Sequence, residues 1–298
     1  MKNDQPSICI VIVNYNGAAY QNDCIKTLYE MNYLNFEIVV IDSASKDNSL
    51  ELLKKSYSDV KIIPCHTNVG VAKGNNIGIE YSINKKFDFT LLINNDIEVD
   101  KHLLEYLVES ADNNTIVVPK IYYYNPHNLI WFAGGKLVWE KGSAVHFGIH
   151  EEDRGQFDKK KYINYAPTCC MLINNTIFEK VGVIDENYFM YYDDTDFCAR
   201  LEKSGVKICY EPKAYMWHKV SSSSGGENSK IQVYYSYRNQ LRYIYKHADC
   251  ITIRTKIYIY CRALAKFILG CIKRNNDVYI MKAYIDYYHE RMGRCDNL

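Results

Sequence analysis

Residues 8–17 read ICIVIVNYNG, an unbroken apolar run (residues 8–13) that ends in the polar turn Asn14-Tyr15-Asn16-Gly17. Four more apolar runs of strand length follow at residues 36–41, 60–63, 90–93 and 115–118, and the segments between them have apolar residues at helical spacing. Apolar runs without alternation indicate strands that are covered on both faces. The sequence therefore predicts an α/β fold, with a mostly parallel sheet flanked by helices.

In a parallel sheet, ligands bind beyond the carboxyl ends of the strands. Three polar segments stand at these predicted ends: Asn14-Tyr15-Asn16, Asp42-Ser43 and Asn94-Asn95-Asp96. None of the strands is followed by G-x-G-x-x-G or by G-x-x-x-x-G-K-[ST]. The sequence thus gives no support to dinucleotide or P-loop chemistry.

The amino-acid composition excludes several further classes of protein. The 298 residues are 48% hydrophobic, which excludes a disordered chain. Their net charge is only +1, which gives no reason to expect nucleic-acid binding. Eleven cysteines without C-x-x-C spacing predict reduced thiols rather than a zinc site. The first residues have no signal-peptide pattern, so we expect a cytoplasmic protein.

The second half of the chain carries a cluster of acidic residues. Residues 120–165 lack periodicity and predict irregular strands and loops, whereas Asp193-Asp194-Thr195-Asp196 begins a predicted helix that ends near Ser204. A strand-end or helix-start Asp can simply cap a helix. Asp42, Asp96 and Asp194, followed by His218, favour a site instead, because strand-end carboxylates suit Mg²⁺ or Mn²⁺. The alternative for His218 is a partly buried side chain packed beside Trp217.

Six blocks in order carry a resemblance to a known family. They are residues 12–16 (IVNYN), 41–49 (IDSASKDNS), 68–78 (NVGVAKGNNIG), 92–96 (LINND), 190–198 (MYYDDTDFC) and 217–226 (WHKVSSSSGG). Over residues 6–247 the chain resembles family 2 inverting nucleotide-sugar glycosyltransferases, in particular the rhamnosyltransferase-like branch of bacterial surface-polysaccharide enzymes. This resemblance implies the Rossmann-like GT-A fold. We expect a catalytic domain over residues 1–247 and a helical, basic extension over residues 248–298.

The resemblance also implies roles for individual residues. The donor-binding residues would be Asn14, Tyr15, Asn16, Asp42, Ser43, Gly74, Asn75 and Asn95, with Asp42 on the pyrimidine base. Asp96 and His218 would be ligands of Mg²⁺ or Mn²⁺, although Asn94 replaces the first carboxylate of the family's D-x-D element. Asp194 would be the catalytic base, with Asp193 in place of the family's supporting Glu.

Together these roles predict transfer of rhamnose or another hexose, with inversion, from a dTDP- or UDP-linked donor. The acceptor would be a hydroxyl of a glycan or of a polyprenyl-linked glycan. A divalent cation can neutralise the departing diphosphate, and one carboxylate base without a covalent nucleophile gives inversion. Two alternatives remain, a non-catalytic nucleotide-sugar-binding protein and a sugar nucleotidyltransferase. The latter needs a basic loop after the first strand, and that loop has no Lys or Arg here.

Three further features have two interpretations each. Trp131, Phe132 and Trp217 either stack on the acceptor or belong to the core. Residues 221–226 are either a lid over the donor or a plain linker. Residues 251–274 have apolar side chains at helical spacing, and the chain from Arg238 onward has 12 basic and five acidic residues, a net +7. This amphipathic tail either packs on the catalytic domain or attaches the protein peripherally to an anionic membrane, which we expect to be the inner face of the cytoplasmic membrane.

Overall fold

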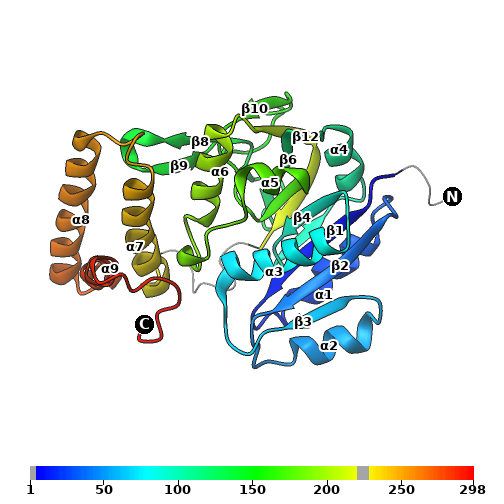
Figure 1. Ribbon diagram of the computed structural model, residues 1–298, viewed down its shortest axis with the longest axis horizontal. Helices are drawn as coiled ribbons and strands as arrows, with labels where there is room; N and C mark the ends of the chain where they lie inside the picture. The colour runs from blue at the N-terminus through cyan, green and yellow to red at the C-terminus, as the bar shows by residue number, and fades with distance from the viewer. Residues whose placement is uncertain (1–4, 220–227) are drawn as a thin grey trace.

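The computed structural model of the chain describes residues 5–219 and 228–298 (Figure 1). The strands are β1 (Ile8–Asn14), β2 (Phe36–Asp42), β3 (Lys61–Pro64), β4 (Phe89–Ile93), β5 (Ile97–Val99), β6 (Thr115–Tyr123), β7 (Ile130–Phe132), β8 (Gly135–Val138), β9 (Ser143–His146), β10 (Lys161–Ile163), β11 (Cys170–Asn174) and β12 (Lys207–His218). The α-helices are α1 (Gln21–Tyr29), α2 (Ser49–Ser56), α3 (Gly70–Asn84), α4 (Leu103–Glu109), α5 (Thr176–Val181), α6 (Asp193–Lys203), α7 (Lys230–Lys246), α8 (Ile253–Lys273) and α9 (Tyr279–Tyr288).

One mixed sheet forms the centre of the described chain, with the strand order β10-β12-β6-β11-β4-β1-β2-β3. β5 is added to β12 and β7 to β6, while β8 and β9 form a separate hairpin. β1 pairs in parallel with β2 and β4, and β2 pairs in parallel with β3. The predicted α/β fold with a mostly parallel sheet flanked by helices is therefore confirmed.

An antiparallel strand interrupts the predicted parallel series. β11 lies between β4 and β6 and runs antiparallel to both. The fifth predicted strand, which is the start of β6, thus keeps the direction of the first four without touching them. Pairing between strands far apart in sequence left no local signal for this insertion.

Helix α3 packs closely on the first strand because two of its residues lack a side chain. The apolar residues of β1 from Ile8 to Ile12 are fully buried, which explains their continuous run. A Cβ atom on Gly78 would lie 2.1 Å from Cγ1 of Val11, and one on Gly74 would lie 2.7 Å from Cγ1 of Val13. The two glycines therefore set the distance between α3 and the sheet.

The strand after α6 is long, running from Lys207 to His218. β12 passes an irregularity between Glu211 and Tyr215 and runs on to His218, parallel to β6 and antiparallel to β5. In the second pairing His218 lies opposite Ile97. This long strand brings residues of the second half of the chain to the carboxyl end of β4.

The C-terminal helices form a layer at one end of the molecule. α7 packs against α9, and α8 lies at the outer edge (Figure 1). Arg238, near the middle of α7, is completely buried. No helix in the described part of the chain is both long enough and apolar enough to cross a membrane.

We predict that Gly78→Ala destabilises the fold. Although Ala favours a helix, its methyl group would overlap the stiff Val11 side chain, and overpacking of this kind lowers the free energy of unfolding by about 1–3 kcal/mol. Urea unfolding measures the change. Val11→Ala in the same chain should recover part of the loss, and an unchanged or higher free energy of unfolding in Gly78→Ala would contradict the prediction.

Candidate active site

The carboxyl ends of β1, β2 and β4 meet around the side-chain amide of Asn14. Because β1 and β2 pair with Asn14 opposite Asp42, Nδ2 of Asn14 donates to Oδ1 of Asp42 at 3.0 Å. Oδ1 of Asn14 accepts from Nδ2 of Asn95 at 3.0 Å. Asn14 and Asp42 are both buried, so their hydrogen bonds fix the geometry of the three strand ends.

A cleft of about 690 Å³, open to solvent, lies over these strand ends. Among the residues that line it are Tyr15, Ser43, Asn75, Asn95 and Asp96, all of them predicted site residues. Ser43 accepts a hydrogen bond from the backbone N–H of Val69 at 2.8 Å, which holds it beside the start of α3. The cleft is therefore bounded by polar groups of both the sheet and α3.

The other four predicted donor-binding residues, Asn14, Asn16, Asp42 and Gly74, do not line the cleft. Gly74 faces Val13 at the contact between α3 and β1, and the cleft at this helix is lined by Gly70, Val71 and Asn75. Asn16 has a φ of 53° and its Oδ1 accepts from the backbone N–H of Lys46 at 2.8 Å. We conclude that Gly74 acts through packing and Asn16 by bracing the loop after β1.

Asp96 and His218 come together at one end of the cleft. Nε2 of His218 lies 3.1 Å from Oδ1 of Asp96, and both side chains are buried. Nδ1 of His218 is buried without a hydrogen-bond partner in the part of the chain that the structure describes, and its ring meets Trp131 edge-on at 4.9 Å. The His218 side chain is therefore aimed at Asp96 rather than packed beside Trp217.

This pair fits an open divalent-cation site. Within residues 5–219 and 228–298 no group of three or more His, Cys, Asp or Glu side chains is placed to hold a metal. Asp96 and His218 offer one oxygen and one nitrogen next to a cleft, so a cation there would need further oxygen ligands from phosphate and water. Mg²⁺ sites are commonly completed by phosphate and water oxygens in this way, whereas the imidazole nitrogen is a ligand typical of transition metals.

A second acidic group lies at the start of α6. Burial and the negative charge of the neighbouring Asp194 raise the pKa of Asp193 to about 7. Burial also raises the pKa of Asp194, although a 2.9 Å hydrogen bond from the Tyr165 hydroxyl opposes the rise. Asp194 is the more exposed of the two. Carboxylates with a raised proton affinity are suited to accept a proton near neutral pH.

The residues before β11 connect the two acidic groups. The backbone N–H of Asn94 donates to the carbonyl of Cys169 at 3.1 Å, and the adjacent Thr168 donates its hydroxyl to Asp193 at 3.5 Å. Burial raises the pKa of the Cys169 thiol, and the charges of Asp96 and Asp194 raise it further. Both carboxylates therefore lie near one buried thiol.

The turn that leads into α6 has an unusual backbone. Phe189, Tyr191 and Tyr192 have φ values of 63°, 62° and 66°, a region that side-chain-bearing residues rarely adopt. Each such residue costs of the order of 1–3 kcal/mol, so the surrounding structure must hold the turn in place. Phe189 and Met190 also line the cleft.

A side chain of α7 holds this turn. Nδ2 of Asn239 donates to the carbonyls of Tyr188, Met190 and Tyr191, at 2.8, 2.8 and 2.9 Å. Sequence analysis missed Asn239 and its neighbour Arg238. The signal that could have identified them is their position: Arg238 and Asn239 are polar residues on the inner face of an amphipathic helix, where the other residues are mostly apolar or aromatic.

Asp196, the third carboxylate of the cluster, has a structural role. Burial alone would raise its pKa, but the hydrogen bond from His247 and the charges of Lys246 and Arg200 lower it to about 2. Its oxygens lie 2.9 Å from Nε2 of His247 and 2.9 Å from Nε of Arg200. The His247 pair attaches α6 to the C-terminal end of α7, whereas the Arg200 pair lies within α6.

The three aromatic residues that were predicted to bind the acceptor lie in three different environments in the structure. Phe132 is fully buried in the core and cannot reach an acceptor, so the prediction that it binds the acceptor is wrong. Trp217 precedes His218 on β12 and points to the other side of the strand, where it packs on Tyr122 and Tyr215. Only Trp131 among the three contacts His218. The predicted lid or linker at residues 221–226 lies outside the described residues.

Two known proteins resemble the chain in sequence over most of its length. The chain is 28% identical over 237 residues to the low-salt glycan biosynthesis hexosyltransferase Agl10 of Haloferax volcanii, covering 78% of this chain and 74% of the relative. It is 24% identical over 297 residues to the dTDP-rhamnosyl transferase RfbF of Shigella flexneri, covering 94% and 93%.

Solved structures share the fold at low sequence identity. GalNAc-T7, solved with UDP, GalNAc and Mn²⁺, matches with a TM-score of 0.64 and 17% identity. The match covers 81% of this chain but only 48% of GalNAc-T7. The mannosyltransferase PcManGT of Pyrobaculum calidifontis, solved with GDP-Man and Mn²⁺, matches with a TM-score of 0.58 and 12% identity over 96% of this chain and 88% of that one. The sequence profile of glycosyl transferase family 2 matches residues 9–182, more than half of the chain, and the chain therefore belongs to this family.

Proposed function

We propose that the protein is an inverting glycosyltransferase that transfers a hexosyl group from a nucleoside diphosphate sugar to an acceptor hydroxyl. The observation that carries this proposal is the pair Asp193 and Asp194, which combines raised pKa values with a position at the start of α6, three residues after Met190 in the wall of the polar cleft. Membership of glycosyl transferase family 2 supports the reaction class.

In this proposal Asp194 is the general base. One of its carboxylate oxygens takes the proton of the acceptor hydroxyl as that oxygen attacks the anomeric carbon. The Tyr165 hydroxyl orients the carboxylate, and the like charge of Asp193 increases its affinity for the proton. A single base with no covalent nucleophile would invert the anomeric configuration.

The donor would lie in the cleft over β1, β2 and β4. Asp42, fixed by Asn14 and by the backbone N–H of Ser45, is the proposed acceptor of a hydrogen bond from the pyrimidine base. Asn75 and Asn95 would face the rest of the nucleotide. Asp96 and His218 would hold Mg²⁺ or Mn²⁺, which when bound neutralises charge on the departing diphosphate.

The donor and acceptor classes rest on the relatives. RfbF is named as a dTDP-rhamnosyl transferase, and Staphylococcus aureus TarS was solved with UDP and UDP-GlcNAc. We therefore propose a dTDP- or UDP-linked rhamnose or other hexose as donor. The proposed acceptor is a glycan or polyprenyl-linked glycan of bacterial surface polysaccharide, reached at the inner face of the cytoplasmic membrane.

Replacing the proposed base tests the assignment. Asp194→Asn should lower kcat by at least about 10²-fold, the usual effect of losing a general base, because an amide cannot take the proton. Transfer from a radiolabelled nucleotide sugar measures the rate, and calorimetry should show unchanged nucleotide binding. Asp249→Asn, at an exposed carboxylate, is the control. Normal turnover by Asp194→Asn would rule out this base.

The acidic limb of the pH profile should depend on Asp193. Only the deprotonated pair can act as base, so kcat/KM should rise with pH as the pair loses its proton, around the pKa of about 7 expected for Asp193. Asp193→Asn removes a neighbouring negative charge, lowers the pKa of Asp194 and should move the limb to lower pH. A limb that stays in place or moves to higher pH would contradict this coupling.

The cation and donor assignments can be checked by thermal shift. A nucleotide sugar that binds only the folded chain raises Tm, and we expect dTDP-rhamnose or a UDP-hexose to do so more strongly with Mn²⁺ present. Asp96→Ala should remove the contribution of Mn²⁺ and leave the weaker metal-free shift. Full activity in excess EDTA would remove the metal from the proposal.

A further inference from the structure

Helix α8 has two apolar faces, of which only one is used in packing. Its inner face is narrow and includes the buried residues Ile259, Ala263 and Gly270. The opposite face carries large side chains in solvent: Ile253, Ile257, Leu264, Ile268, Leu269 and Ile272, each about half exposed or more, with Ile272 at 72%. A contiguous exposed apolar face of this kind marks an interaction site in a soluble fold. We call it the outer face of α8.

The charges around the outer face all have one sign. Between Asp249 and Asp277 there are six basic residues and no acidic residue: Arg254, Lys256, Arg262, Lys266, Lys273 and Arg274. Arg262, Lys266 and Lys273 share one border of the outer face, since they are spaced by four and seven residues. The outer face is therefore apolar in the middle and positive at its edge.

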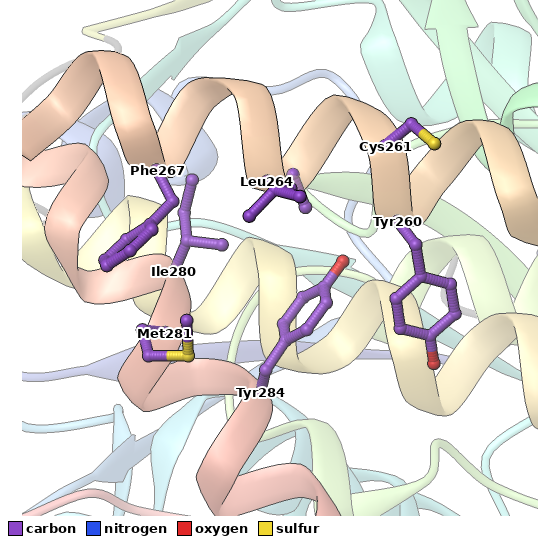
Figure 2. Close-up of a pocket in the computed structure, with 8 residues that line it drawn as sticks. Tyr260, Cys261, Leu264, Phe267, Ile280, Met281 and Tyr284 are labelled. Carbon is purple, nitrogen blue, oxygen red and sulfur yellow. The ribbon is translucent and has the colours of Figure 1, made fainter.

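An apolar groove adjoins the outer face. It lies between α8 and α9 and is lined by Tyr260, Cys261, Ala263, Leu264, Phe267, Ile280, Met281 and Tyr284 (Figure 2). Leu264 belongs to both the groove and the outer face, and on the α9 side Met281 is 42% exposed. The groove thus extends the apolar surface from α8 onto α9.

We propose that the outer face of α8 and the α8–α9 groove bind the headgroup region of an anionic lipid bilayer. The apolar side chains would enter the boundary between headgroups and acyl chains, and the border of basic residues would meet anionic lipids. The proposal extends the expected membrane attachment to a defined surface, and it does not depend on the transfer activity.

Charge favours a lipid surface over a second copy of the chain. Two outer faces packed together would bring up to twelve basic side chains close to each other, with no acidic residue of α8 to pair with them. Each basic residue near an anionic leaflet instead contributes about 1 kcal/mol to binding. The helix is also about 30 Å long, so it can lie along the surface with several apolar side chains inserted at once.

Vesicle co-sedimentation of the full chain tests the proposal. The protein should sediment with vesicles of phosphatidylcholine containing about one third phosphatidylglycerol, and far less with pure phosphatidylcholine. Raising the salt from roughly 0.1 M to 1 M should release it, because the Debye length falls from about 10 Å to about 3 Å. Failure to sediment with the anionic vesicles at low salt would overturn the proposal.

Matched variants locate the surface. Ile268→Glu should weaken vesicle binding by about tenfold or more, because a charge replaces an inserted apolar side chain. Leu34→Glu changes a similarly exposed residue before β2 and should bind as the unmodified chain does. Lys266→Glu with Lys273→Glu should lose the preference for anionic lipid, and Lys54→Glu with Lys55→Glu on α2 should keep it.

Two measurements separate this proposal from its alternatives. Ile268 is exposed, so Ile268→Glu should unfold at the same temperature and transfer sugar to a water-soluble acceptor at the same rate. If transfer is absent in every variant while vesicle binding follows the pattern above, only the proposed function fails. If light scattering shows a dimer that Ile268→Glu converts to a monomer, with no vesicle binding in either, the outer face joins two copies and the lipid proposal is wrong.

Discussion

The active-site end of this protein depends on one side-chain amide, that of Asn239. Its two N–H groups satisfy three carbonyls of a turn in which three residues have left-handed backbone angles. The same turn presents the Phe189 carbonyl to the backbone N–H of Val71 at 2.8 Å, at the start of α3, and ends where α6 begins with Asp193. Without the amide, each of these carbonyls would lose a hydrogen bond, and the turn that forms part of the cleft wall would be held less firmly.

This constraint makes α7 and the last residues of the chain part of the support of the cleft. The buried guanidinium of Arg238 donates to the carbonyl of Tyr188 at 3.4 Å and to that of Gly293 at 2.7 Å, so the last residues of the chain bond to the same turn region. The boundary expected between residues 247 and 248 runs between α7 and α8, which together with α9 form one layer. Since α8 packs on α9 and α9 packs on α7, a surface on α8 belongs to this layer rather than to a detached tail.

The sequence was informative wherever a local pattern corresponds to a local structure. Unbroken apolar runs identified the strands, and the polar residues after them gave Asp42, Asn95 and Asp96. Long-range pairing produced the rest: β11 between β4 and β6, the extension of β12 to His218, and the contact of Asn239 with a turn about fifty residues earlier. Gly74 was assigned to the cleft because a glycine beside a nucleotide site and a glycine against a strand look alike in sequence.

The first turn of α6 shows how surroundings divide similar residues between roles. Asp193, Asp194 and Asp196 all favour the positive end of the helix, yet their pKa values move in opposite directions. Asp196 meets His247, Lys246 and Arg200, so it stays ionised and structural. Asp193 and Asp194 accept hydrogen bonds from hydroxyl groups and, within the part of the chain that the structure describes, form no ion pair with a basic side chain, and burial therefore raises their proton affinity. Lys246 of α7, His247 after it and Arg200 of α6 thus all pair with Asp196, the carboxylate that supports the helix, and none of them pairs with Asp193 or Asp194 within the described residues.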